Sequence, residues 1–165
     1  MKLSKDLEKL IIEQIRNEFE SAYIYLGMSA AMGSMSFVGI AEWMRRQAKE
    51  EIEHGMKFYD YLVSRGVKVE LLPISQASTD YKTPLNAFEV ALNHERKVTG
   101  LIHKMYDLAV SLKDYESQNM LNWFIMEQIE EENQTQYFVD RLKFAGDDAC
   151  AILRIDREAG KNPEM

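Results

Sequence analysis

Acidic side chains interrupt the apolar stripes of four segments that have helical periodicity. Glu18 lies in the first segment, Glu51 and His54 lie three residues apart in the second, and Glu95 lies in the third. The fourth segment carries Glu127-Gln128-Ile129-Glu130-Glu131. Burying a charge costs free energy unless an opposite charge meets it, and no Lys or Arg holds a matching place on these stripes. Metal ions are the simplest counter-charge, and this spacing is typical of helical bundles that hold two iron ions.

The types of side chain in this set narrow the choice of metal. Carboxylate oxygens with one imidazole favour iron over structural zinc, which prefers a closed tetrahedron of Cys and His, whereas magnesium and calcium usually take oxygen ligands alone. Bridging carboxylates can hold two cations a few ångströms apart, and two Fe(II) ions can each give one electron to one O₂ molecule. We therefore expect an Fe(II)/Fe(III) di-iron centre that reacts with O₂ (or H₂O₂).

Each of these residues has a plainer explanation when it is taken alone. A single glutamate on a helix is usually solvated, and a Glu-x-x-His spacing such as Glu51 to His54 often occurs by chance. His94 and His103 lie off the pattern and are interpreted as surface or packing residues. The whole set is stronger evidence for a metal site than any one residue, because four helices each place an acidic residue near mid-length on the apolar stripe.

Length, charge and cysteine content limit the class of protein. The 165 residues suit one domain over 1–165, and a net charge of −7 argues against nucleic acid as the main partner. The only cysteine, Cys150, cannot form an internal disulfide, which favours a reducing compartment. The N-terminal ten residues lack the apolar region of a signal peptide, and no apolar run is long enough to span a membrane. We expect a cytoplasmic protein with no membrane partner.

Apolar periodicity and cap residues predict five helices. Ser4 suits the start of the first helix, Thr83-Pro84 the start of the third and Asp114 the start of the fourth. Gly146 suits the end of the fourth. The expected helices cover about 4–32, 37–64, 84–112, 114–145 and 148–159.

The lengths of the connections predict the topology. The turns at 33–36 and 113–114 are too short for anything but antiparallel neighbours. Residues 66–82 can extend about 56–61 Å at ~3.3–3.6 Å per residue, and helices of nearly thirty residues are about 40–45 Å long at ~1.5 Å per residue. This segment can therefore cross the whole bundle. One long crossover between two helical hairpins predicts an all-α, ferritin-like four-helix bundle over about 4–145 with a short fifth helix.

Motifs over essentially the whole chain resemble those of the bacterial non-haem ferritins. They are Glu18, Tyr25, Glu51-x-x-His54, Glu95 and Trp123-x-x-x-Glu127-Gln128-x-Glu130-Glu131. The resemblance implies a ferroxidase that oxidises Fe(II) with O₂. It also implies iron storage and detoxification, with ferric mineral held in a hollow homo-oligomeric shell of twenty-four identical subunits.

The resemblance also implies a role for individual residues. The first iron would lie on Glu18, Glu51 and His54. The second iron would share Glu51 and would also be served by Glu95 and Glu131, with Gln128 close by. A third iron site would use Glu50, Glu127, Glu130 and Glu131. Tyr25 and Trp123 would be nearby redox-capable aromatics, although aromatics at helical spacing are more often packing residues.

Departures from related families narrow the resemblance. Bacterioferritins have a second Glu-x-x-His on the fourth helix, whereas here Glu130 follows Glu127. Their haem-binding methionine would fall near Ile52, so no haem is expected. Two alternatives to a storage protein remain. They are a small di-iron peroxidase or oxygenase without a cage, and a structural bundle whose acidic residues are solvated.

The fifth predicted helix allows two interpretations. Four helices already complete a bundle, and the apolar segment 149–155 follows them. It either packs back on its own subunit or is buried against neighbouring copies. The resemblance implies the second arrangement, in which this helix lines a symmetry axis of the shell.

Overall fold

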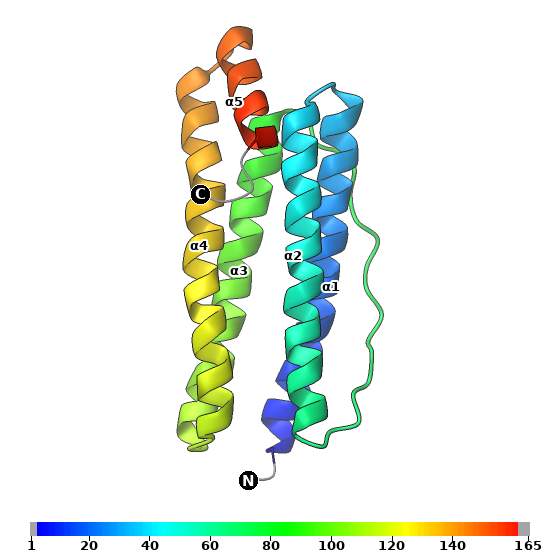
Figure 1. Cartoon of the computed structure of the whole chain (residues 1–165), viewed down its shortest axis with the longest axis vertical. Helices are drawn as coiled ribbons and strands as arrows, with labels where there is room; N and C mark the ends of the chain where they lie inside the picture. The colour runs from blue at the N-terminus through cyan, green and yellow to red at the C-terminus, as the bar shows by residue number, and fades with distance from the viewer. Residues whose placement is uncertain (1–2, 162–165) are drawn as a thin grey trace.

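The chain folds into four long helices and one short helix, as the sequence predicts. The computed structural model describes residues 3–161, and no strand occurs within them. Each helix end lies within about two residues of its expected position. Among residues 3–161, no helix combines the length and the apolar character that crossing a bilayer would require. The helices are α1 (Lys5–Ser34), α2 (Val38–Ser64), α3 (Pro84–Ser111), α4 (Tyr115–Ala145) and α5 (Ala149–Lys161) (Figure 1).

Three of the helix starts are fixed by local side-chain caps. The Ser4 hydroxyl accepts a hydrogen bond from the Leu7 amide at 3.2 Å, and Thr83 and Asp114 serve α3 and α4 in the same way. These bonds satisfy amides that a helix leaves without an intrahelical partner. The caps therefore set where α1, α3 and α4 begin, and with them the levels of the acidic residues on these three helices.

The crossover over residues 67–82 runs beside α1 from one end of the bundle to the other (Figure 1). Its backbone passes so close to α1 that a Cβ on Gly27 would lie 2.3 Å from the Ser78 carbonyl oxygen. Its position is also marked by the Ser75 amide, which donates to the Glu20 carboxylate at 3.3 Å. Because this segment returns the chain to the end of the bundle at which α2 begins, α3 runs parallel to α2. The ferritin-like topology is confirmed.

The core consists of two apolar clusters, one toward each end of the bundle. Tyr25, Trp43 and Phe88 belong to the cluster near the α1–α2 turn, and Phe58 and Phe124 belong to the other. Each long helix passes from one cluster to the other near its middle. The buried glutamates fall at these crossings, so a polar layer separates the two clusters.

Helix α5 packs on its own subunit, which is one of the two arrangements that the sequence left open for this segment. Ile155 is buried, and the Asp156 carboxylate accepts a hydrogen bond from the Ile40 amide at 2.8 Å. The backbones also meet closely, because a Cβ on Gly39 would lie 1.8 Å from the Asp156 carbonyl oxygen. The α5 helix therefore has an intramolecular partner, whatever else it contacts.

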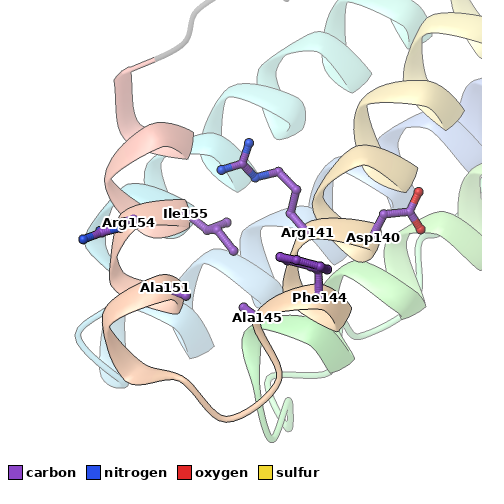
Figure 2. Close-up of a pocket in the computed structure, with 7 residues that line it drawn as sticks. All are labelled: Asp140, Arg141, Phe144, Ala145, Ala151, Arg154 and Ile155. Carbon is purple, nitrogen blue, oxygen red and sulfur yellow. The ribbon is translucent and has the colours of Figure 1, made fainter.

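A pocket of about 610 Å³ remains open between α4 and α5. Figure 2 shows Phe144 and Ala145 on α4 and Ala151 and Ile155 on α5 along its wall. The Phe144 side chain is 96% exposed, although it is one of the largest apolar side chains of the chain. This end of the molecule thus presents apolar surface that its own subunit does not cover.

Candidate metal centre

The residues expected at the di-iron centre lie together in the polar layer between the two clusters. All of them are buried, even though each is a charged or strongly polar side chain. They come from all four long helices: Glu18 from α1, Glu51 and His54 from α2, Glu95 from α3, and Gln128 and Glu131 from α4.

Three of these side chains form a group that could hold one metal ion. Glu18, Glu51 and His54 each place one ligand atom so that all three atoms lie within 4.8 Å of one another. His54 Nδ1 lies 3.7 Å from Glu51 Oε2. The Glu18 carboxylate accepts a hydrogen bond from Gln14 Nε2 at 2.8 Å, which fixes its orientation. Two carboxylates and an imidazole at this spacing suit a divalent transition metal.

The other half of the layer is oriented by polar neighbours. The Tyr25 hydroxyl donates to Glu95 Oε1 at 2.5 Å, and Gln128 Nε2 lies 3.4 Å from Glu95 Oε2. Gln47 Nε2 donates to Glu131 Oε2 at 2.8 Å. Each of these two carboxylates therefore keeps an oxygen in a defined position while its side chain is buried.

Burial makes the charged forms of these carboxyls costly. It raises the pKa of Glu18 above the usual value, raises the pKa of Glu51 and of Glu131 well above it, and raises the pKa of Glu95 to about 7. Repulsion between neighbouring carboxylates raises the pKa of Glu51 and Glu131 further. A cation in the layer would supply the missing counter-charge, so metal binding is coupled to the release of protons.

The acidic run on α4 is divided between buried and exposed positions. Glu127 Oε1 lies 3.7 Å from His54 Nε2, and these two residues form a second possible metal group with Glu131. Burial and then repulsion from Glu127 and Glu130 raise the pKa of Glu50. Glu130 is exposed and accepts a hydrogen bond from Gln134 at 2.9 Å. Glu50 and Glu130 thus lie near the second group, but neither belongs to it.

The two aromatic residues singled out in the sequence have different environments. Tyr25 is buried, and its ring packs at 6.2 Å from that of Trp43. Burial, followed by repulsion from Glu95, raises the pKa of the Tyr25 hydroxyl well above its usual value. Trp123 is partly exposed, with its ring centroid 5.6 Å from that of His54. Tyr25 therefore contacts the layer directly, whereas Trp123 lies on its outer side.

Sequence reasoning assigned Gln128 to the site but did not assign Gln14 and Gln47, which also orient carboxylates. Gln14 lies four residues before Glu18, which is the spacing of neighbours on one helix face, so this pairing was available from the sequence. Gln47 lies on the predicted apolar stripe, but its partner is on another helix. His94 is a packing residue as expected, since its Nε2 lies 2.6 Å from the Ser21 hydroxyl oxygen.

A four-helix bundle with one long crossover and a buried Glu/His layer defines the ferritin-like class of proteins. The sequence model of the ferritin family, described as a ferritin-like domain, matches residues 8–145. A bacterial non-heme ferritin of Bacteroides fragilis is 38% identical over 159 residues, covering 96% of this chain and 99% of the relative. One of Staphylococcus aureus is 34% identical over 158 residues, covering 96% and 95%.

Solved structures agree with the sequence relatives. An open pore ferritin from the archaeon Archaeoglobus fulgidus superposes with a TM-score of 0.96 at 35% identity, covering 98% of each chain. A structure described as a humanized archaeal ferritin has the same TM-score at 34% identity, covering 98% of this chain and 99% of the other. The chain therefore belongs to the ferritin family, and both the family and the fold support iron storage as its function.

Proposed function

We propose that this protein is a ferroxidase, which oxidises Fe(II) with O₂ inside each subunit and stores the product as ferric mineral. The observation that carries the proposal is the buried layer of four carboxylates and one histidine, to which all four long helices contribute. Such a layer destabilises the metal-free fold, and two divalent cations would remove that cost.

Fe(II) is the substrate in this proposal, and the chain supplies its two positions. Glu18, Glu51 and His54 bind the first ion, and Glu51 is shared with the second. Glu95 and Glu131 complete the second position, with Gln128 beside it. Two Fe(II) ions each lose one electron to O₂, and O₂ takes up two protons to give H₂O₂. Carboxyls with a raised pKa release protons when they bind the ions, close to where O₂ needs them.

Three further acidic residues, together with Glu131, fit a third iron position on the outer side of His54. Glu50, Glu127, Glu130 and Glu131 offer oxygen ligands, which suit Fe(III). This position adjusts how many Fe(II) ions are oxidised per O₂ and passes the ferric product onward. Tyr25 and Trp123 lie close enough to the layer to donate an electron.

The proposed assembly is a hollow homo-oligomer of twenty-four copies of this chain. Phe144 and the pocket between α4 and α5 support it, since exposed apolar surface of this kind is usually covered by another subunit. A cytoplasmic location is supported by the single cysteine, Cys150, which is exposed and forms no disulfide.

Anaerobic Fe(II) titration followed by a pulse of air tests the function. The wild type should bind two Fe(II) per subunit and oxidise them in a fast phase. Glu18→Ala and His54→Ala should each slow that phase by well over an order of magnitude, because each removes a ligand of the first ion. Glu42→Ala, an exposed residue of α2, is the matched control. Fast oxidation in both ligand variants would refute the assignment.

A further inference from the structure

Two surface pockets approach the candidate centre from different sides of α4. One, of about 500 Å³, lies between α2 and α4, and the other, of about 380 Å³, lies between α3 and α4. Among the described residues that line the first pocket, only His54 is buried, and among those that line the second, only Gln128 is buried. Each pocket therefore ends at a residue of the candidate centre.

The α2–α4 pocket is strongly acidic. Glu50, Glu53, Asp60 and Glu127 line it, against a single ammonium group from Lys57. That ammonium lies over the Trp123 ring, 3.9 Å from its centroid. An excess of carboxylates in a concave surface concentrates cations. This pocket is suited to the approach of Fe(II).

The α3–α4 pocket has the opposite character. Its walls include Ile125 and Ile129, and its one carboxylate, Glu132, is already engaged. Glu132 accepts a hydrogen bond from the Thr99 hydroxyl at 2.5 Å and lies 3.9 Å from the Arg96 guanidinium. This pocket has one carboxylate, which faces the Arg96 guanidinium, and one imidazole, His103, whereas four carboxylates line the α2–α4 pocket. It therefore attracts a free cation less strongly. A small uncharged molecule can enter such a mainly apolar pocket without the desolvation cost that a cation would meet.

The floor of the α3–α4 pocket touches the centre through one side chain. Gln128 Nε2 lies 3.3 Å from the Glu95 carbonyl oxygen, 3.4 Å from Glu95 Oε2 and 3.3 Å from Thr99 Oγ1. Gln128 thus lines the pocket and contacts the Glu95 carboxylate with the same side chain. The three contacts of its amide are long, at 3.3–3.4 Å, so they hold this group weakly.

From these observations we propose that the α3–α4 pocket is the entrance for the uncharged oxidant, O₂ or H₂O₂, and that Gln128 gates it. Fe(II) arrives separately through the acidic α2–α4 pocket. The inference rests on the proposed ferroxidase function and assigns each of its two substrates to its own route. Separate routes keep the oxidant path from being blocked by cations held at the acidic pocket.

Three matched tryptophan variants test the assignment. Ile129→Trp fills the α3–α4 pocket and Ile52→Trp fills the α2–α4 pocket, from positions that are 52% and 45% exposed. Met126→Trp, at a 66% exposed position that lines neither of these two pockets, is the control. Because all three side chains are 45–66% exposed, the larger ring need not enter the core. Asn133→Trp is a second way to fill the α3–α4 pocket if Ile129→Trp does not fold.

The two readouts are oxidation of Fe(II) as a function of O₂ or H₂O₂ concentration, and anaerobic stopped-flow binding of Co(II). Ile129→Trp should lower kcat/KM for the oxidant by about tenfold, with Co(II) binding unchanged. Ile52→Trp should slow Co(II) binding by a similar factor and leave the KM for the oxidant unchanged. A loss with only one of the two oxidants would identify the molecule that uses the route.

Failure of this inference differs from failure of the proposed function. If the wild type does not oxidise Fe(II), the function itself is wrong. If the wild type oxidises Fe(II) rapidly, and the folded Ile129→Trp and Asn133→Trp proteins keep the wild-type kcat/KM for both oxidants, only the route is wrong. Slower Co(II) binding in Ile129→Trp would also overturn the assignment, because the pocket would then serve the cation.

Discussion

Glu95 connects three of the helices around the centre. Its carboxylate accepts a hydrogen bond from Tyr25 of α1 and lies beside Gln128 of α4, while its own side chain comes from α3. Burial raises its pKa to about 7, so near neutral pH its charge depends on what occupies the layer. This single side chain therefore links protonation with helix packing and, in the proposed centre, with metal binding.

The stability of the metal-free protein should fall as the pH rises from about 5 to about 8. A carboxyl whose pKa rises from 4.5 to about 7 on folding binds more protons in the folded state, so its stabilising effect is present below pH 4.5 and is lost as the pH passes about 7. Glu95 alone would contribute on the order of 3 kcal/mol, and Glu18, Glu51 and Glu131 act in the same direction.

Glu95→Gln isolates the contribution of this residue. Glutamine keeps a polar side chain of the same shape but cannot ionise. The variant should therefore remain folded and lose less stability than the wild type between about pH 5 and about pH 8. Urea unfolding of the metal-free wild type and variant gives the comparison. A wild type that becomes more stable toward pH 8, or a variant with an unchanged pH slope, would contradict the interpretation.

Glu130 tests the third iron position separately from the first two. Glu130→Ala removes an exposed ligand that is not part of either compact metal group, so the fast oxidation of two Fe(II) should persist. The number of Fe(II) oxidised per O₂ and the later turnover should change. Glu116→Ala, an exposed residue in the first turn of α4, is the control. If crystals soaked in Fe(II) contain two metals only, and the ratio is unchanged, there is no third position.

At the scale of elements, α5 caps the N-terminal turn of α2. The residue before α2, Phe37, provides no side-chain cap. Instead, the Asp156 carboxylate of α5 accepts a hydrogen bond from the Ile40 amide. Arg46 of α2 in turn donates to the Ala159 carbonyl oxygen at 2.6 Å. A negative side chain at a helix N-terminus is also favoured by the helix dipole. The fifth helix is therefore part of the subunit fold, in addition to its proposed role in assembly.

Asp156→Ala should lower the free energy of unfolding by about 1 kcal/mol, the usual effect of losing a helix cap. Asp107→Ala, an exposed aspartate on α3, should have little effect. Gly39→Ala should cost more than Asp156→Ala, because the added Cβ overlaps the α5 backbone. Thermal and urea unfolding measure all three. If Asp156→Ala and Asp107→Ala are equally stable, the α5–α2 contact does not act as a cap.

At the scale of the whole molecule, a substitution at Phe144 tests assembly separately from folding. Its side chain is 96% exposed, so Phe144→Glu should leave helical content and the folding of the subunit unchanged. The same change should weaken or open the proposed shell, because it puts a charge into apolar surface that another copy would cover. Size-exclusion chromatography and electron microscopy measure the outcome.

Truncation after Gly146 removes α5 and provides the comparison for that experiment. It should weaken the shell too, but it also uncovers Ile40 and removes the α2 cap, so thermal stability should fall. A shell that survives both changes would show that this end of the molecule is not an assembly surface. A small, active species in the wild type would favour the di-iron peroxidase or oxygenase alternative.

The helices and their order were predictable from the sequence because their causes are local. Ser4, Thr83 and Asp114 cap amides within three residues, and the apolar periodicity is a property of each segment. The crossover followed from chain length alone. The levels of the acidic residues followed from helical rise, so their meeting in one layer was predictable as well.

The contacts that set the chemistry of the layer were decided only by the tertiary structure. Tyr25 and Glu95 are 70 residues apart, Gln47 and Glu131 are 84 apart, and Ile40 and Asp156 are 116 apart. Such pairs depend on how each helix is rotated about its axis and how far it is shifted against its neighbours, and packing of side chains from several helices at once sets both. For the same reason, the sequence placed four carboxylates in one layer, but only the packed bundle made one side of α4 acidic and the other largely apolar.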